Sequence, residues 1–147
     1  MILVDANLLV YAHNLGSEHH APAKLWLEEV LETERDVRIG LVTVLAFLRV
    51  VTNPRVFARP LSQADAVQVV TTWLGRDNVA LCQPTERHWQ LLAELATDGQ
   101  ARGPLLMDAH VAALALEHGA TLATTDRDFT RFTGLRWFNP LASTPGG

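Results

Sequence analysis

The chain has 147 residues, of which 48% are hydrophobic and 19% charged, and its formal net charge is −4. This length suits one domain with a substantial core, and the composition argues against a disordered chain. Nucleic-acid-binding domains usually carry a strong basic excess, so the acidic balance disfavours that class unless metal-binding carboxylates supply the charge. A lone cysteine, Cys82, excludes an intrachain disulfide and suits a reducing compartment, so we expect a cytoplasmic protein. The apolar first twelve residues include Asp5 and are too short to cross a membrane, so no membrane association is expected.

Hydrophobic periodicity and turn residues predict strands that alternate with helices along the chain. The predicted strands cover residues 2–4, 38–42, 79–82, 121–125 and 135–138. The predicted helices cover a short segment at 8–12, then 23–34, 43–52, a segment from a Ser62 cap to Leu74, a segment from a Thr85 cap to about Asp98, and 108–118. This alternation predicts an α/β domain over residues 1–141, with a mostly parallel central sheet and helices on both faces, and a flexible tail over 142–147.

Aspartates stand beside the last helix and strand of this pattern, and after the first strand. Asp5 follows the first strand, Asp126 follows the strand at 121–125, and Asp108 begins the helix that leads into that strand. Ligands of parallel α/β sheets bind beyond the carboxyl ends of the strands, where such side chains can meet. Clustered carboxylates repel one another unless a cation neutralises them, and Mg²⁺ or Mn²⁺ prefers oxygen ligands. Each aspartate taken alone is explained equally well as a helix cap, whereas Asp5 and Asp126 together favour a site.

Four segments resemble a PIN-domain ribonuclease, and more narrowly the VapC-type toxin of a VapBC toxin–antitoxin pair. They are residues 2–11 (ILVDANLLVY), 47–57 (FLRVVTNPRVF), 107–114 (MDAHVAAL) and 119–129 (GATLATTDRDF). The resemblance implies a three-layer α/β/α Rossmann-like fold, Mg²⁺- or Mn²⁺-dependent hydrolysis of RNA (tRNA or mRNA), a homodimer, and inhibition by a VapB-type antitoxin. The catalytic and metal-binding positions that it implies are Asp5, Asp108 and Asp126, with Asn7 and Thr124 as supporting polar groups.

One position departs from the family pattern. The glutamate that usually precedes the Phe-Leu-Arg run of the third helix is replaced here by Ala46. Because alanine cannot bind a cation, either metal binding should be weaker or Asp128 should supply part of the missing coordination. The alternative is a catalytically weakened PIN domain that acts as an RNA- or antitoxin-binding module.

A different enzyme class, phosphotransfer through an aspartate, is also conceivable for a strand that ends in Asp5. Haloacid-dehalogenase-type phosphatases need a second aspartate two positions later, where this chain has Asn7, and a lysine near the phosphate. The only lysine is Lys24, on a predicted outer helix. The sequence therefore disfavours this class.

Several other side chains have more than one interpretation. Phosphate contact and an ordinary surface or intrachain role both stay open for five arginines: Arg49, Arg55, Arg59, Arg127 and Arg131. His110 is expected to face solvent or a neighbouring carboxylate. Three tryptophans on predicted helices are expected to pack or to anchor an interface rather than to stack on bases: Trp26, Trp73 and Trp89.

Overall fold

The sheet of this protein is built from parallel strands, as the sequence predicts. The computed structural model describes residues 1–142, so most of the expected tail lies outside the described residues. Five strands form one sheet in the order β3-β2-β1-β4-β5, and every neighbouring pair is parallel. The strands are β1 (Ile2–Val4), β2 (Val37–Gly40), β3 (Val79–Cys82), β4 (Thr121–Ala123) and β5 (Trp137–Phe138).

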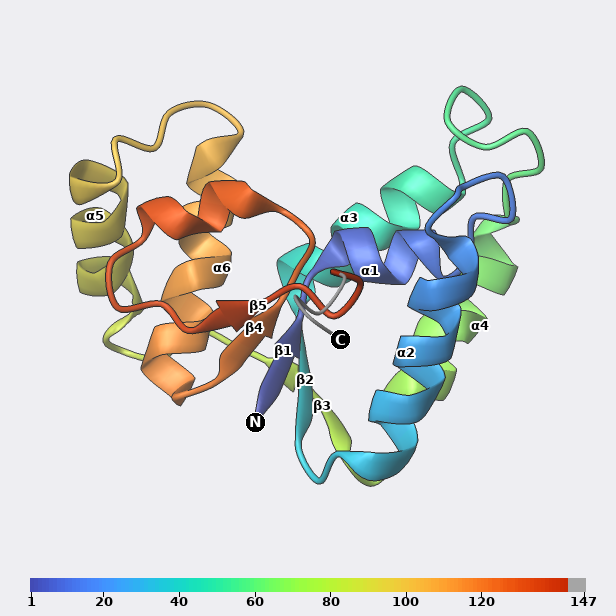
Figure 1. Ribbon diagram of the computed structural model, residues 1–147, viewed down its shortest axis with the longest axis horizontal. Coiled ribbons are helices and arrows are strands. Elements are labelled where there is room, and N and C mark those ends of the chain that lie inside the picture. The colour runs from blue at the N-terminus through green and yellow to red at the C-terminus, as the bar shows by residue number, and fades with distance from the viewer. Residues whose placement is uncertain (143–147) are drawn as a thin grey trace.

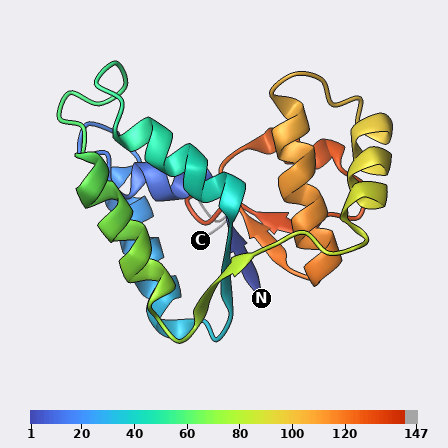
Figure 2. The same ribbon diagram turned by 180° about the vertical axis from the view of Figure 1, so that it is seen from behind.

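Helices cover both faces of the sheet and complete the three layers of the expected α/β/α fold (Figures 1 and 2). The first four helices in the chain pack on one face, and the last two pack on the other. They are α1 (Ala6–Tyr11), α2 (His20–Thr33), α3 (Leu41–Val51), α4 (Gln63–Leu74), α5 (His88–Asp98) and α6 (Leu105–His118), with a 3-10 helix η1 (Arg127–Arg131) after β4. No helix within residues 1–142 combines the length and the apolar character that a membrane span requires.

Each face of the sheet has its own hydrophobic core. On β1, Leu3 packs with the residues of α5 and α6, whereas Val4 packs with those of α1 to α4. Leu122 and Ala123 of β4 divide between the two cores in the same way. Successive side chains of a strand point to opposite faces, so a strand buried on both faces has no polar alternation. This explains why short apolar runs mark the strands of this chain.

Four helices begin earlier than predicted: α1 begins at Ala6 rather than at residue 8, and α2, α3 and α6 also begin early. α2 begins at His20 rather than at residue 23, since Pro22 falls in its first turn, where no N–H is needed for an intrahelical bond. α3 begins at Leu41 and β2 already ends at Gly40, which has extended backbone angles and caps the helix. The apolar run around these residues fits either element, so periodicity does not locate the boundary.

The second half of the chain differs from the prediction at four boundaries, one of which is the start of β5 at Trp137 rather than at residue 135. Thr85 does not cap α5; its Oγ1 accepts from the Arg87 N–H at 3.2 Å, and Arg87 is the cap residue. α6 begins at Leu105, so Asp108 lies within the first turn instead of opening the helix. β4 ends at Ala123 rather than at residue 125, because the following residues turn into the site described below.

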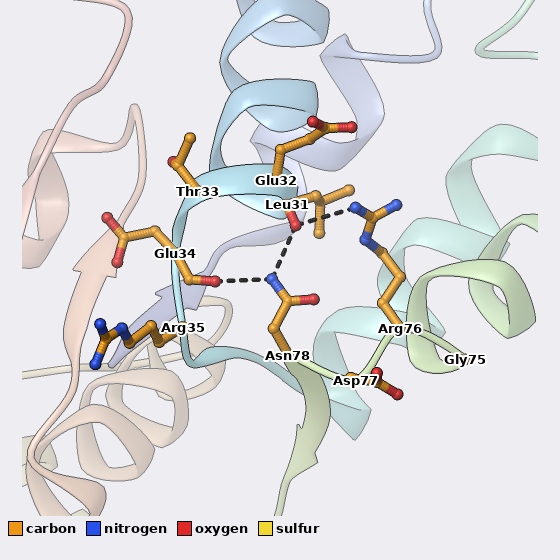
Figure 3. A pocket seen from close by; sticks show the side chains of 9 residues that line it. All are labelled: Leu31, Glu32, Thr33, Glu34, Arg35, Gly75, Arg76, Asp77 and Asn78. Carbon is orange, nitrogen blue, oxygen red and sulfur yellow. Dashed lines mark hydrogen bonds between the residues drawn. The ribbon is translucent and has the colours of Figure 1, made fainter.

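At a shallow hollow by the amino ends of β2 and β3, side chains of the turn before β3 are hydrogen-bonded to the end of α2, a contact that we call the clasp (Figure 3). The Asn78 Nδ2 donates to the carbonyl oxygens of Leu31 and Glu34, both at 2.8 Å, and the Arg76 Nη2 donates to the Leu31 oxygen at 3.1 Å. Carbonyls in the last turn of a helix have no intrahelical partner. The clasp therefore completes the end of α2, on the opposite edge of the sheet from the one where ligands of such folds bind.

Replacing Asn78 by alanine is expected to lower the free energy of unfolding by about 1–3 kcal/mol, because the Glu34 carbonyl loses its side-chain donor and the Leu31 carbonyl keeps only the one from Arg76. Urea denaturation of the purified variant measures this change. Gln90→Ala, on the exposed surface of α5, is the matched control and should stay within about 0.5 kcal/mol of the parent. Equal effects of the two variants would show that the clasp contributes nothing.

Candidate active site

A buried threonine joins the residues that follow β1 and β4. These strands are neighbours in the sheet, at the point where the strand order changes direction. The Thr124 hydroxyl donates to Asp5 Oδ2 at 2.7 Å and accepts from the Asp126 N–H at 3.0 Å and from Asn7 Nδ2 at 3.3 Å. Thr124 is 0% exposed. The network thus holds Asp5 and Asp126 at the switch point where open α/β sheets bind their ligands.

Two more carboxylates, those of Asp108 and Asp128, converge on Asp126 beside this network. One carboxylate oxygen from each of Asp108, Asp126 and Asp128 lies within 4.8 Å of those of the other two. Asp108 reaches the cluster from the first turn of α6, and the Asp126 Oδ1 accepts from the Asp128 N–H at 2.8 Å. Asp126 is therefore both a cap of η1 and a member of the cluster, so the two interpretations of this residue do not exclude each other. The structure also brings in Asp128, the candidate substitute for the missing glutamate.

The carboxylates of this cluster are held at an electrostatic cost. Burial raises the pKa of Asp5, although hydrogen bonds from Thr124 and Ala6 oppose the rise. Burial, followed by the charges of Asp126, Asp5 and Asp128, raises the pKa of Asp108 to about 6. A bound divalent cation would reduce the repulsion between these carboxylates and offset the energetic cost of burying their charges. The oxygen-only donor set, together with the raised pKa values of Asp5 and Asp108, fits a hard divalent metal ion.

This cost predicts a pH dependence for the metal-free protein. The pKa of Asp108 rises from its ordinary value of 3.8 to about 6 in the folded protein. The folded chain therefore binds a proton on this carboxylate more tightly than the unfolded chain does. The contribution of this group to stability is complete below pH 3.8 and is lost as the pH rises through about 6. Asp108→Asn should therefore raise the melting temperature in EDTA at about pH 7.5 and leave it nearly unchanged at about pH 4.

Differential scanning fluorimetry at both pH values measures this effect. Asp77→Asn, an exposed aspartate on the opposite edge of the sheet, should change neither melting temperature by a comparable amount. If Asp108→Asn is less stable than the parent at the higher pH, the ionised Asp108 carboxylate does not destabilise the metal-free fold, contrary to this prediction.

A pocket of ≈ 450 Å³ opens beside the acidic residues. Asp5 and Asp108 line one side of it, and the first three turns of α3 line the other. Ala46 lies on that α3 wall, so the position where the family has its glutamate faces the acidic pocket. Arg49 lines the same wall one turn further along the helix. The missing carboxylate is therefore a real difference in the lining of this pocket.

Arg131 has an intrachain role. Its Nη1 donates to the Gly99 oxygen at 2.9 Å and its Nε donates to the Asp128 backbone oxygen at 3.3 Å. Its charge also lowers the pKa of Asp108, against the larger opposing effects. Arg131 therefore stabilises the backbone next to the acidic cluster through its hydrogen bonds to Gly99 and Asp128.

His110 is half-buried, and its hydrogen-bonding partner is a second histidine rather than a carboxylate. Its Nδ1 contacts the Nε2 of His88 at 2.9 Å, and the Nδ1 of His88 in turn contacts Glu117 Oε2 at 2.9 Å. This chain of polar side chains links α5 to α6 away from the acidic cluster. His110 and Glu117 are seven residues apart on one helix, a spacing that places them on the same face. No signal in the sequence indicates that His88 lies between them.

The tryptophans do not share one role. Trp73 is buried and packs on Phe47, with ring centroids 4.9 Å apart, and Trp26 lies at 6.4 Å from Phe138. Trp89 is 74% exposed instead. It lines an apolar hollow that adjoins the acidic pocket, since Val42 and Met107 line both. Packing is thus confirmed for Trp26 and Trp73, and an interface role for Trp89 stays a prediction.

Comparison with known proteins agrees with this geometry. A model of the PIN domain matches residues 2–135. Ribonuclease VapC37 of Mycobacterium tuberculosis is 43% identical over 142 residues, which cover 97% of this chain and 99% of that protein. The chain belongs to the VapC family of PIN-domain ribonucleases.

Solved structures of VapC proteins show the same fold at lower sequence identity. VapBC2 from Rickettsia felis, bound to a DNA fragment of its promoter, superposes with a TM-score of 0.69 at 20% identity, over 95% of this chain and 98% of that one. The toxin VapC20 of Mycobacterium tuberculosis, which cleaves the sarcin-ricin loop, gives 0.67 at 20% identity, over 92% and 99%. The expected three-layer PIN fold of this VapC family member is thereby confirmed.

Proposed function

We propose that this VapC family member is the toxin of a type II toxin–antitoxin pair, an endoribonuclease that hydrolyses phosphodiester bonds of RNA at the acidic pocket. The observation that carries the proposal is the convergence of Asp108, Asp126 and Asp128 beside Asp5, in a chain 43% identical to a VapC ribonuclease. Solved relatives are complexes of VapB with VapC, which supports a VapB-type antitoxin as the partner that inhibits this chain. Both tRNA and mRNA remain candidate substrates.

The cofactor that we propose is Mg²⁺, with Mn²⁺ as a substitute. Asp5, Asp108 and Asp126 would hold the ion, and Asp128 would supply the carboxylate that Ala46 lacks. When bound, such an ion stabilises the negative charge that develops on the phosphate during hydrolysis. The hydrogen bonds from Thr124 and Ala6 fix the orientation of the Asp5 carboxylate. The Asn7 amide donates to the Thr124 hydroxyl, which fits the supporting role that we propose for both residues.

The direct test is cleavage of defined RNAs by the purified protein. Cleavage of a tRNA or mRNA substrate is expected with Mg²⁺ or Mn²⁺ and should stop in EDTA. Added antitoxin, expressed from a small reading frame beside the gene, should inhibit the reaction. Absence of metal-dependent cleavage from tRNA, mRNA and ribosomal RNA alike would leave only the binding-module alternative.

Ala46 is the observation that favours this alternative, and it carries a prediction. Ala46→Glu should tighten Mn²⁺ binding by about tenfold or more, because it adds an oxygen ligand to the pocket wall. Isothermal titration calorimetry measures the affinity. Ala64→Glu adds the same charge on an exposed position of α4 and should leave the affinity unchanged. Unchanged affinity in Ala46→Glu as well would remove position 46 from the metal site.

A homodimer is also part of the proposal. Large apolar side chains surround the mouth of the acidic pocket and the adjoining hollow, and such exposed patches are typical of protein interfaces. They are Leu45, Trp89, Leu106 and Met107, each between 46% and 74% exposed. Sedimentation velocity of the purified chain tests this state, and a Trp89→Asp variant should shift it toward the monomer.

The cytoplasmic location stays a prediction.

A further inference from the structure

Arg49 occupies a position between two hollows on one side of the molecule. It lines the acidic pocket together with Ala46, and it also lines a hollow of ≈ 620 Å³ formed with the start of α4. Residues three apart on a helix share a face and are about 4.5 Å apart along the axis. A polymer that leaves the acidic pocket past Ala46 therefore meets Arg49 next.

Arg49 is exposed, and its guanidinium has no intrachain partner within residues 1–142. None of the ion pairs found over residues 1–142 involves Arg49, and its side chain makes no hydrogen bond there. This contrasts with Arg131, whose guanidinium donates to two backbone oxygens. Of these two arginines beside the acidic residues, Arg49 is the one whose guanidinium has no hydrogen-bond or ion-pair partner within residues 1–142.

The alanine at position 46 explains why Arg49 has no ion-pair partner on its own helix. A carboxylate three residues before an arginine on a helix lies within reach of it and interacts favourably with it. The usual glutamate of the family would stand at that distance from Arg49, whereas Ala46 offers no partner. The same substitution that removes a metal ligand thus leaves a cation facing the pocket. Arginine is suited to phosphate, since its planar fork donates two parallel hydrogen bonds.

We propose that Arg49 binds an RNA phosphate adjacent to the scissile one and so positions the substrate over the acidic residues. This inference rests on the proposed catalytic site at Asp5, Asp108 and Asp126. It assigns to Arg49 a role in substrate binding, and the chemical step is left to the carboxylates and their metal ion.

Steady-state cleavage by the full chain at saturating Mn²⁺ tests the proposal. Arg49→Ala should raise KM for RNA by about tenfold or more while kcat changes less than about threefold, because a charge-assisted contact to the substrate is lost. The slope of log KM against log salt should fall by about one, as expected for one lost phosphate contact. Arg49→Lys should restore the salt slope but only part of the KM, since an ammonium lacks the fork.

Controls separate this contact from general electrostatics. Arg35→Ala removes an exposed arginine at the opposite edge of the sheet and should change neither KM nor the salt slope. Ala46→Glu should raise KM in the parent, because the new carboxylate pairs with Arg49, and should raise it no further in Arg49→Ala. A KM and salt slope that are unchanged in Arg49→Ala, or a loss confined to kcat, would overturn the proposal.

Binding by an inactive variant distinguishes this failure from failure of the catalytic site. Fluorescence anisotropy with Asp5→Asn measures RNA affinity without cleavage, and adding Arg49→Ala should weaken binding by the same factor as KM. If Asp5→Asn still cleaves RNA, the proposed site itself is wrong. If Asp5→Asn is inactive but Arg49→Ala binds RNA normally, only the role of Arg49 is wrong.

Discussion

Asp5→Asn is expected to lower kcat for RNA cleavage by about 10²–10³-fold or more, the range seen when one electrostatic stabiliser is removed from an active site. The substitution removes one negative charge from the acidic pocket and preserves the shape of the side chain. Its carbonyl oxygen can still accept one of the two hydrogen bonds that now come from Thr124 and Ala6. The loss therefore reports on the carboxylate charge and its metal ion.

The stability of the same variant provides an internal check. Burial raises the pKa of Asp5, which means that the folded protein holds this charge at a cost. Asp5→Asn should therefore melt at the same temperature as the metal-free parent or higher, so inactivity cannot be attributed to unfolding. Asp77→Asn, on the opposite edge of the sheet, should retain full activity. Activity above about a tenth of the parent in Asp5→Asn would contradict a catalytic role for this residue.

Thr124→Val is expected to lower the free energy of unfolding by about 2–4 kcal/mol, because near-isosteric replacement leaves two donors and a carboxylate oxygen without a partner. The hydroxyl of Thr124 bonds to Asp5, Asn7 and the Asp126 N–H, and it is 0% exposed. The pKa of Asp5 should rise further, since the hydrogen bond from Thr124 opposes its rise. Activity at neutral pH should fall in parallel, because Asp5 loses its fixed orientation.

A second threonine on the same strand separates the network from a general strand effect. Thr121→Val changes a half-buried residue of β4 whose side chain has no hydrogen bond over residues 1–142. Urea denaturation should show a change within about 0.5 kcal/mol for this control. Equal destabilisation by the two variants would show that the hydroxyl of Thr124 does not hold the site together.

The elements that could be predicted from the sequence are those with strong local signals. The run 79–82 matches β3 at both ends, and the helix predicted from the Ser62 cap is α4, whose first turn the Ser62 hydroxyl caps through the Asp65 N–H at 3.1 Å. The predicted boundaries were wrong where the local sequence fits two kinds of element equally well. The junction of β2 with α3 lies inside one apolar run, which suits a buried strand and a buried helix equally.

The candidate site was predicted in part for the same reason. Asp5 and Asp126 were found because each follows an apolar run, and a parallel sheet gathers the carboxyl ends of its strands. The proximity of Asp128 to Asp108 depends on the 3-10 turn after β4, which the sequence did not indicate. The direction in which Arg49 faces depends on how α3 packs against the sheet.

The sequence by itself determined the alternation of buried strands and helices, hence the parallel three-layer fold, because periodicity and helix caps act over a few neighbouring residues. It also determined which acidic side chains stand at strand ends. Only the tertiary structure decided which of them meet. Thr124 contacts Asp5 across 119 positions of the chain, through the pairing of β1 with β4. Such a contact depends on strand order and on the burial of both faces of the sheet, properties of the packed whole that no local run of residues specifies.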